Sequence, residues 1–305
     1  NKKLKVAVYA ISKNEEKQVK RWYESMKEAD SIYVLDTGST DNTVNLLKSL
    51  GVNVSVETIS PWRFDVARNK SLELVPEDVD VCVCTDLDEV FESGWRKELE
   101  KLWEPNARIR YNYNWSFDKY NKPAVNFYIE KIHSRDNYEW VHPVHEVLKT
   151  SIKEKIITTN NITLNHYPDS TKSRSSYLPL LELSVQEDPN DDRNMHYLGR
   201  EYMYYGRWNY CIDTLIKYLH LKSAVWKDER SASMRFITRS YTHLKTYINE
   251  TFSWDSTIYD LLSIAYYYKN DIQSSLKNVL IALKMEPNNE RLQNNKKIIE
   301  EKIQL

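Results

Sequence analysis

The chain has 305 residues and a nearly neutral composition, with 43 Lys and Arg against 44 Asp and Glu. This balance excludes a global electrostatic field that would draw the protein to nucleic acid or to an anionic membrane. The length favours two domains, and no apolar run reaches the roughly 18 to 20 residues that a membrane-spanning helix needs. The three cysteines, Cys82, Cys84 and Cys211, lack metal-site spacing, and we expect buried, reduced thiols in a cytoplasmic protein.

Strand-like and helix-like segments alternate along the first 90 residues. Strand patterns cover residues 4–11, 31–35, 52–57 and 79–85, and helical patterns cover residues 15–28, 41–50 and 67–74. The alternation predicts a Rossmann-like, doubly wound α/β sheet. Ligands of such sheets bind outside the carboxyl ends of the strands. The segments after Ile11, Leu35 and Thr85 are therefore where we expect the chemistry.

The pattern changes twice in the remaining chain. Residues 107–113, 124–129 and 161–166 alternate in short segments, which predicts added strands that cover the nucleotide half of the site and carry acceptor contacts. Beyond about Ser173 the pattern is helical throughout. We therefore expect a catalytic domain over residues 1–170 and a helical domain over residues 171–305.

The helical half carries a repeated pattern. One register comprises Tyr197, Leu198, Gly199, Tyr202, Gly206, Cys211 and Leu215, and a second comprises Leu262, Ala265, Tyr266, Ser275, Val279, Ala282 and Pro287. Both follow the spacing of a tetratricopeptide repeat. Leu198 and Leu262 lie 64 residues apart, about twice the usual period of roughly 34 residues. A degenerate middle repeat is therefore expected around residues 232–243.

Two aspartates directly follow the buried strand pattern at residues 79–85. Asp86 and Asp88 stand two apart, so an extended chain directs both carboxylates to one side, where they repel unless a cation lies between them. Mg²⁺ or Mn²⁺ held by one or two carboxylates usually completes its shell with substrate phosphates. The pattern thus predicts a divalent metal that clamps a diphosphate, although acidic turns are common after strands.

Four blocks in order resemble family 2 glycosyltransferases of the GT-A fold. They are Ser12-Lys13-Asn14-Glu15-Glu16, Asp36-Thr37-Gly38-Ser39-Thr40-Asp41-Asn42-Thr43, Phe64-Asp65-Val66-Ala67-Arg68-Asn69 and Asp86-Leu87-Asp88. That family shows KNEE, D-x-G-S-x-D-x-T, ARN and DxD in the same order. The resemblance is close over residues 4–90 and looser as far as His166. It implies a GT-A fold, a nucleotide-sugar donor with a UDP-sugar favoured, and Mn²⁺ or Mg²⁺ as cofactor.

The resemblance also implies which residues bind the donor. The candidates are Ile11, Lys13, Glu15, Asp36, Thr37, Arg68, Asp86, Leu87 and Arg135. Asp36 or Thr37 would accept the imide hydrogen of a uracil ring. Arg68 offers a planar fork of donors to a diphosphate, unless it forms a surface ion pair with Asp65. Asn14 and Glu15 either contact the donor or cap the helix that they begin. For Asp41 and Thr43 we prefer the capping role.

Further blocks extend the resemblance. They resemble segments of protein and lipopolysaccharide glycosyltransferases, notably bacteriocin S-glycosyltransferases with a tetratricopeptide-type tail. The blocks are Arg135, Trp140-Val141-His142-Pro143-Val144-His145-Glu146 and Asn165-His166-Tyr167. Pro143 replaces the usual glycine. Glu146 is the leading candidate for the catalytic base, with His145 beside it and Asp88 or Glu89 as substitutes. His166 is expected to join Asp86 and Asp88 as a metal ligand, whereas His142 is expected to be structural.

The predicted reaction is metal-dependent transfer of a sugar to a protein, peptide or glycan acceptor. Inversion at the anomeric carbon is implied by the family and not by the residues. A nucleotidyltransferase is one alternative, but it would need a glycine-rich phosphate loop, and residues 7–16 contain no glycine. The other is a catalytically silent domain with a tetratricopeptide adaptor, which the intact Arg68, Asp86 and Asp88 disfavour. Expected partners exclude nucleic acid and include a membrane surface if the acceptor is lipid-linked, and a second copy bound through the tail.

Overall fold

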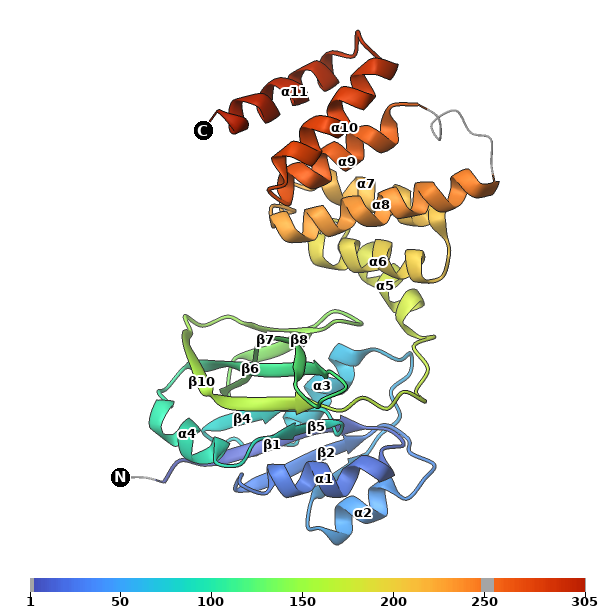
Figure 1. The fold of residues 1–305 in the computed structure, drawn as a ribbon. Helices are drawn as coiled ribbons and strands as arrows, with labels where there is room; N and C mark the ends of the chain where they lie inside the picture. The colour runs from blue at the N-terminus through green and yellow to red at the C-terminus, as the bar shows by residue number, and fades with distance from the viewer. Residues whose placement is uncertain (1–2, 248–254, 305) are drawn as a thin grey trace. The chain divides into compact units, whose positions relative to one another are not determined.

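The computed structural model describes residues 3–247 and 255–304. The chain forms two compact units, Asn1–Ser173 and Arg174–Leu305 (Figure 1). Within the described ranges, no helix is both long enough and apolar enough to cross a bilayer. The three cysteines are buried and free, as predicted.

An eight-stranded mixed sheet forms the centre of the first unit, in the order β3-β2-β1-β4-β7-β6-β10-β5. The first four strands run parallel: β3 (Asn53–Val56), β2 (Ser31–Asp36), β1 (Val6–Ser12) and β4 (Val81–Cys84). Next come β7 (Pro123–Ser134), antiparallel to β4, then β6 (Ala107–Phe117), β10 (Lys155–His166) and β5 (Glu89–Phe91). The prediction of a mixed α/β sheet with parallel strands, like a GT-A fold, is confirmed.

Side chains of β1 alternate between two cores, one on each face of the sheet. Val6, Val8 and Ala10 pack with α1 (Glu16–Met26), α2 (Thr43–Ser49) and α4 (Trp95–Leu102). Ala7 and Tyr9 point to the other face, where α3 (Phe64–Glu73) and the separate hairpin of β8 (Tyr138–Val141) and β9 (Val147–Thr150) cover them. The strand and helix order predicted for the first 90 residues is thus present, with shifted boundaries. Sequence patterns did not reveal α4, β5 or the β8–β9 hairpin.

The second unit contains helices α5 to α11. Their bounds are α5 (Tyr177–Glu187), α6 (Asp192–Tyr204), α7 (Trp208–His220), α8 (Lys227–Tyr247), α9 (Thr257–Tyr268), α10 (Ile272–Met285) and α11 (Glu290–Ile303). The stretch 232–243, expected to hold a middle repeat, lies inside the single 21-residue helix α8.

Small residues stand where α6 meets α7 and where α9 meets α10. A Cβ atom at Gly199 would lie 2.3 Å from Cδ2 of Leu215, so the α6–α7 crossing has no room for a larger residue. At the second crossing, the hydroxyls of Ser263 and Ser275 each donate to the other's backbone carbonyl, at 2.8 and 2.7 Å. The two crossings therefore share a close approach of their helix backbones.

We expect Gly199→Ala to destabilise the protein. Leu215 is fully buried, and overpacking of a closed core usually costs about 1 to 3 kcal/mol, which exceeds the gain of up to about 1 kcal/mol in helix propensity. Urea unfolding measures the difference. Lys217→Ala, at an exposed position of α7, is the control and should change stability by no more than about 0.5 kcal/mol. A Gly199→Ala protein as stable as the parent would contradict the close approach.

Candidate functional site

The loops that follow β1, β2 and β4 meet at one edge of the sheet, because these strands are parallel neighbours. Two bonds tie the first two loops together. The side-chain oxygen of Asn14 accepts the backbone N–H of Thr40 at 2.8 Å, and the backbone N–H of Glu15 donates to the hydroxyl of Thr43 at 2.8 Å. The first two sequence blocks therefore form one continuous surface at the carboxyl edge.

Asp36 organises the loop after β2 from inside the protein. Its carboxylate accepts the hydroxyls of Ser12 at 2.8 Å and Ser39 at 2.6 Å, and the backbone N–H groups of Gly38 at 3.0 Å and Ser39 at 2.8 Å. The residue is fully buried, and a carboxylate has about four lone-pair sites. The expectation that Asp36 accepts an imide hydrogen therefore does not fit this geometry. Thr37 is also buried, and its hydroxyl donates to the carbonyl of Ser12 at 3.0 Å, which leaves its oxygen able to accept.

Glu15 faces the turn that holds the two aspartates. Burial raises the pKa of Glu15 to about 7. The hydrogen bond and charge of Lys172 lower this pKa, and repulsion from Asp88 and Asp86 raises it further. Lys172 forms an ion pair with Glu15 and donates to the carbonyl of Lys13 at 3.2 Å. The segment after β10 thus returns to the loop after β1. The side chain of Glu15 does not cap α1.

Arg68 of α3 is the buried cation of the site. Its Nη2 lies 2.6 Å from Oδ1 of Asp86, and its Nε lies 2.9 Å from Oε1 of Glu146. The guanidinium also lies over the Trp140 ring, 5.8 Å from the centroid. Arg68 is only 3% exposed. The alternative of a surface ion pair with Asp65 is wrong, because Asp65 pairs with Arg63.

The charge of Arg68 sets the protonation of Asp86. Burial alone would raise the pKa of Asp86, but the charges of Arg68 and Lys131 and the hydrogen bond from Arg68 outweigh it and lower that pKa to about 2. Asp86 is therefore ionised at neutral pH. Its side chain remains 41% exposed, so a carboxylate is presented to solvent beside a fixed guanidinium.

Asp88 and His166 form the second polar pair of the site. Nε2 of His166 lies 3.3 Å from Oδ2 of Asp88, and Nδ1 bonds the backbone carbonyl of Trp115 at 3.0 Å. A carbonyl only accepts, so Nδ1 carries a hydrogen and directs Nε2 toward the carboxylate. Burial lowers the pKa of His166, but the bond and charge of Asp88 outweigh it and raise the pKa.

A carboxylate beside an imidazole whose other nitrogen is anchored is a donor set suited to Mn²⁺. The predicted trio, however, does not converge. Asp86 turns to Arg68 instead of to Asp88, and within the described ranges no three His, Cys, Asp or Glu side chains gather as a metal-binding group. The physical reason is that Arg68 supplies the counter-charge of Asp86. Asp88 and His166 fit a metal, with Asp86 at their side.

Glu89 binds the turn at residues 86–88 from inside the protein. It is buried, and its Oε1 accepts the backbone N–H of Asp86 at 2.6 Å. Burial raises the pKa of Glu89, and the neighbouring Lys131 opposes this effect. Glu89 was a substitute candidate for the catalytic base, and this anchoring role inside the protein disagrees with that candidacy.

The loop that carries His145 and Glu146 is attached to α3. The amide of Asn69 bonds both the backbone N–H and the carbonyl of Trp140, each at 2.8 Å. The carbonyl of Pro143, the residue that stands where the related pattern has glycine, accepts the N–H of Phe64 at 2.9 Å. These bonds place Glu146, whose side chain is 11% exposed, against Arg68. His145 has a positive φ of 50°.

Three of the predicted donor-binding residues do not present side chains to this cluster. Arg135 donates through Nε and Nη2 to the carbonyl of Val75, at 3.0 and 2.8 Å, and its neighbour Ser134 pairs with Val81 at the amino end of β4. Arg135 therefore lies at the opposite end of that strand from Asp86. Leu87 is 1% exposed and belongs to the core. Ile11 is half-buried and packs with a small apolar cluster.

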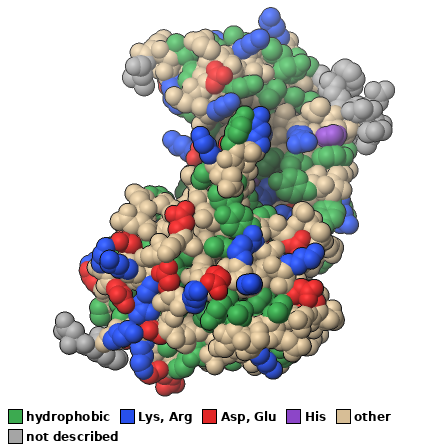
Figure 2. Space-filling view, turned by 60° about the horizontal axis from the view of Figure 1, so that its bottom comes forward, with side chains coloured by type: hydrophobic (Ala, Val, Ile, Leu, Met, Phe, Trp, Pro, Cys, Tyr) green, Lys and Arg blue, Asp and Glu red, His purple; other side chains and the backbone are tan. Residues whose placement is uncertain are grey.

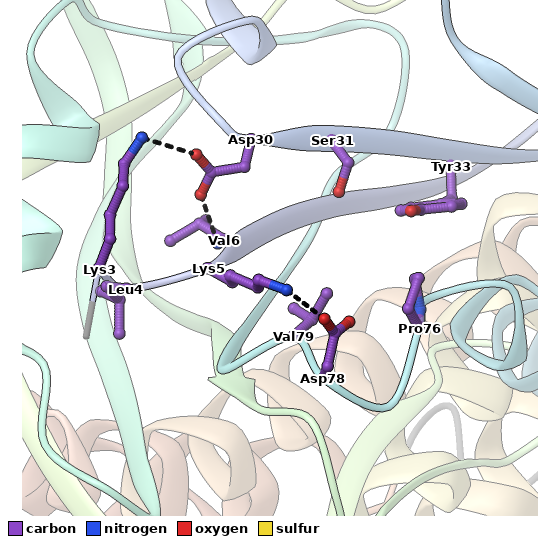
Figure 3. A pocket seen from close by; sticks show the side chains of 10 residues that line it. All are labelled: Lys3, Leu4, Lys5, Val6, Asp30, Ser31, Tyr33, Pro76, Asp78 and Val79. Carbon is purple, nitrogen blue, oxygen red and sulfur yellow. Dashed lines mark hydrogen bonds and ion pairs between the residues drawn. The ribbon is translucent and has the colours of Figure 1, made fainter.

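A depression of about 400 Å³ lies at the amino ends of the parallel strands (Figure 3). Its charged side chains are engaged by neighbours: Lys3 with Asp30 at 3.5 Å, and Lys5 with Asp78. It contains none of the residues predicted to be catalytic. On the face shown in Figure 2, basic and acidic side chains intermingle, in keeping with the neutral composition.

The sequence analysis missed three residues that contribute to the site, namely Lys131, Lys172 and Trp115. Lys131 lies in β7, Lys172 in a polar stretch after β10, and Trp115 in β6. None belongs to a motif, and each meets the site only through contacts with residues distant in sequence. Only the strand register and the return of the chain after β10 bring them there.

Comparisons with known proteins show what the first unit is similar to. Residues 8–151 match the family described as Glycosyl transferase family 2, so the chain contains a domain of that family. An uncharacterized glycosyltransferase of Rickettsia typhi is 32% identical over 108 residues, 35% of this chain and 36% of that protein. A counterpart in Rickettsia conorii is 32% identical over 114 residues, 36% of this chain and 39% of that protein. The match thus spans little more than a third of these curated relatives.

Two solved structures are also similar at low sequence identity. Staphylococcus aureus TarS in complex with UDP-GlcNAc is 11% identical, with a TM-score of 0.42 over 93% of this chain and 92% of that chain. Mycobacterium tuberculosis glucosyl-3-phosphoglycerate synthase, solved with Mn²⁺, UDP and glucosyl-3-phosphoglycerate, is 21% identical, with a TM-score of 0.30 over 36% of this chain and 44% of that chain.

We expect Arg68→Met to lower the free energy of unfolding by about 3 kcal/mol, because it leaves Asp86 and Glu146 without their counter-charge. Adding Glu146→Gln should recover about 1 kcal/mol or more, since the two sites are coupled. Urea unfolding of the single and double variants measures the coupling.

Lys70→Met on the same helix is the matched control. Its pair with Glu57 is exposed on both sides and should contribute at most about 1 kcal/mol. Additive effects of Arg68→Met and Glu146→Gln would show that the bridge does not link the two segments.

Proposed function

We propose that the first unit is the catalytic domain of a metal-dependent glycosyltransferase that takes its sugar from a nucleoside diphosphate sugar, with a UDP-sugar as the favoured donor. The observation that carries this proposal is the meeting of Arg68, Asp86, Asp88 and His166 at the carboxyl edge of the sheet. The first three of these residues lie inside the segment that matches the family, residues 8–151. A fixed guanidinium can bind the oxygens of a diphosphate, and hard oxygen ligands beside it can bind a divalent cation that does the same.

In this proposal Asp88 and His166 hold the divalent cation, Mn²⁺ or Mg²⁺, with Asp86 beside them. The cation supplies positive charge that stabilises the departing diphosphate. Arg68 supplies the protein's own positive charge, from a position that Asp86 and Glu146 keep fixed. Because the guanidinium has five donor hydrogens and is preorganised, it needs little rearrangement when charge develops on the leaving group. Thr37, with Lys13 and Glu15 nearby, borders the nucleotide side.

Glu146 is the proposed base. Its carboxylate is oriented by Nε of Arg68 at 2.9 Å, which holds an oxygen where an acceptor hydroxyl or thiol can deliver a proton. The acceptor would then attack the anomeric carbon directly, with inversion and without a covalent enzyme intermediate. His145, next in the chain, is the second candidate for this role, and Asp88 is the third.

For the second unit we propose a tetratricopeptide-like domain that offers a partner or acceptor surface, or a dimer contact. The small residues at its two helix crossings, Gly199 and the Ser263–Ser275 pair, support this proposal. The same proposal includes a boundary near residue 170 between a catalytic and a helical domain. It also includes the likeness to bacteriocin S-glycosyltransferases. We further propose a cytoplasmic location for the protein, and a protein, a peptide or a glycan as the acceptor.

The test is turnover of UDP-sugars to free UDP with Mn²⁺ present, compared between the parent and Asp88→Asn. We expect about a 100-fold loss in the variant, the magnitude typical of removing one element of charge stabilisation. Chelation of the cation should abolish turnover in the parent.

Asp78→Asn is the matched control, because Asp78 lies in the depression at the other end of the strands, and it should retain parental turnover. Equal turnover by Asp88→Asn and the parent, or turnover that persists after chelation, would remove the metal from the mechanism.

A further inference from the structure

Two neighbouring strand segments close to the site carry no charge. They are residues 111–117 of β6 and 123–129 of β7, and they consist of aromatic, aliphatic, amide and small residues. In the whole chain, 29% of the residues are charged. An uncharged, partly exposed surface of this length therefore stands apart from the rest of the protein.

The strand register sorts these side chains onto two faces. Tyr113 lies opposite Phe127 in the antiparallel pair, so their side chains share a face, and their rings meet at 5.4 Å. Trp115 follows two residues after Tyr113 and contacts it at 6.3 Å. Asn114 lies opposite Asn126 on the other face. One face of the hairpin thus carries Tyr113, Trp115 and Phe127, and the other carries Asn112, Asn114, Asn126 and Tyr128.

The aromatic face passes from the core to the surface. Tyr113 is 6% exposed, whereas Trp115 is 46% and Phe127 is 47% exposed. The inner ring fixes the position of the outer two, so two large aromatic surfaces are held in place and remain open. Rigid, exposed aromatic rings supply contact area at low entropic cost.

The same face continues directly into the proposed catalytic site. The Trp115 ring stacks on His166 with centroids 4.5 Å apart and an interplanar angle of 24°, and its carbonyl anchors Nδ1 of the same histidine. His166 in turn contacts Asp88. A molecule resting on Trp115 and Phe127 would therefore lie beside the groups proposed to bind the donor diphosphate.

We propose that Trp115 and Phe127 form an acceptor subsite for a neutral saccharide. The C–H faces of a pyranose ring pack on aromatic surfaces, and a neutral saccharide needs no counter-charge from the surface on which it rests. A phosphate-bearing acceptor or a charged peptide would find no counter-charge in the two segments. As the acceptor of a sugar transfer, this assignment rests on the proposed function, but binding to the platform does not require the metal or the donor.

The experiment is a titration of the full chain with cellobiose, maltose and N,N′-diacetylchitobiose, followed by saturation-transfer NMR in EDTA and without nucleotide. We expect at least one disaccharide to bind, and Trp115→Ala and Phe127→Ala each to weaken it about 3- to 10-fold, the usual effect of losing one ring contact. Trp115→Tyr, which keeps a ring beside His166, should bind within about twofold of the parent and guards against a folding defect.

Trp226→Ala is the matched control, because Trp226 is 63% exposed in the second unit, and its binding should equal that of the parent. The proposal is overturned if no disaccharide binds, if both alanine variants bind as the parent does, or if an N-acetylated, C-amidated Gly-Ser-Tyr peptide, which is uncharged, binds in place of the sugars. Saccharide binding in a protein that fails to turn over any UDP-sugar would overturn the proposed function and leave the platform standing.

Discussion

The buried guanidinium of Arg68 is the interaction on which the rest of the site depends. It joins a turn at the end of β4, through Asp86, to a loop that follows β8, through Glu146. Without it, the carboxylates of Asp86 and Glu146, from distant parts of the chain, would lose the cation that they share. The tie between Asn69 and Trp140 adds a second link between α3 and that loop. Charge and backbone bonding thus fix the position of Glu146 together.

Much of the first unit could be predicted because its signals are local. Strand and helix periods alternate over the first 90 residues, and parallel neighbours bring the ends of β1, β2 and β4 together wherever the sequence places polar blocks there. Asp86 and Asp88 followed from that rule, whereas Arg68 followed from the resemblance to the family. Arg135 did not, because a sequence block does not show to which end of a strand its residue belongs.

The remaining parts depend on contacts between residues far apart in the chain. Lys131 and Trp115 reach the site through the register of β6, β7 and β10, and Lys172 reaches Glu15 because the chain returns after β10. Asp36 was expected to face a ligand, but the serines and backbone N–H groups around it enclose its carboxylate. Such saturation by neighbours cannot be read from a motif, since it requires the loop conformation. The same holds for the aromatic platform, whose faces appear only when the strands are paired.

The most direct test of the account is a crystal structure of the chain with Mn²⁺ and UDP, with the metal located by its anomalous signal. The account predicts a manganese peak bonded to Asp88 and His166, and the diphosphate beside Arg68. A peak that contacts neither Asp88 nor His166, or UDP bound in the depression at the amino ends of the strands, would contradict it.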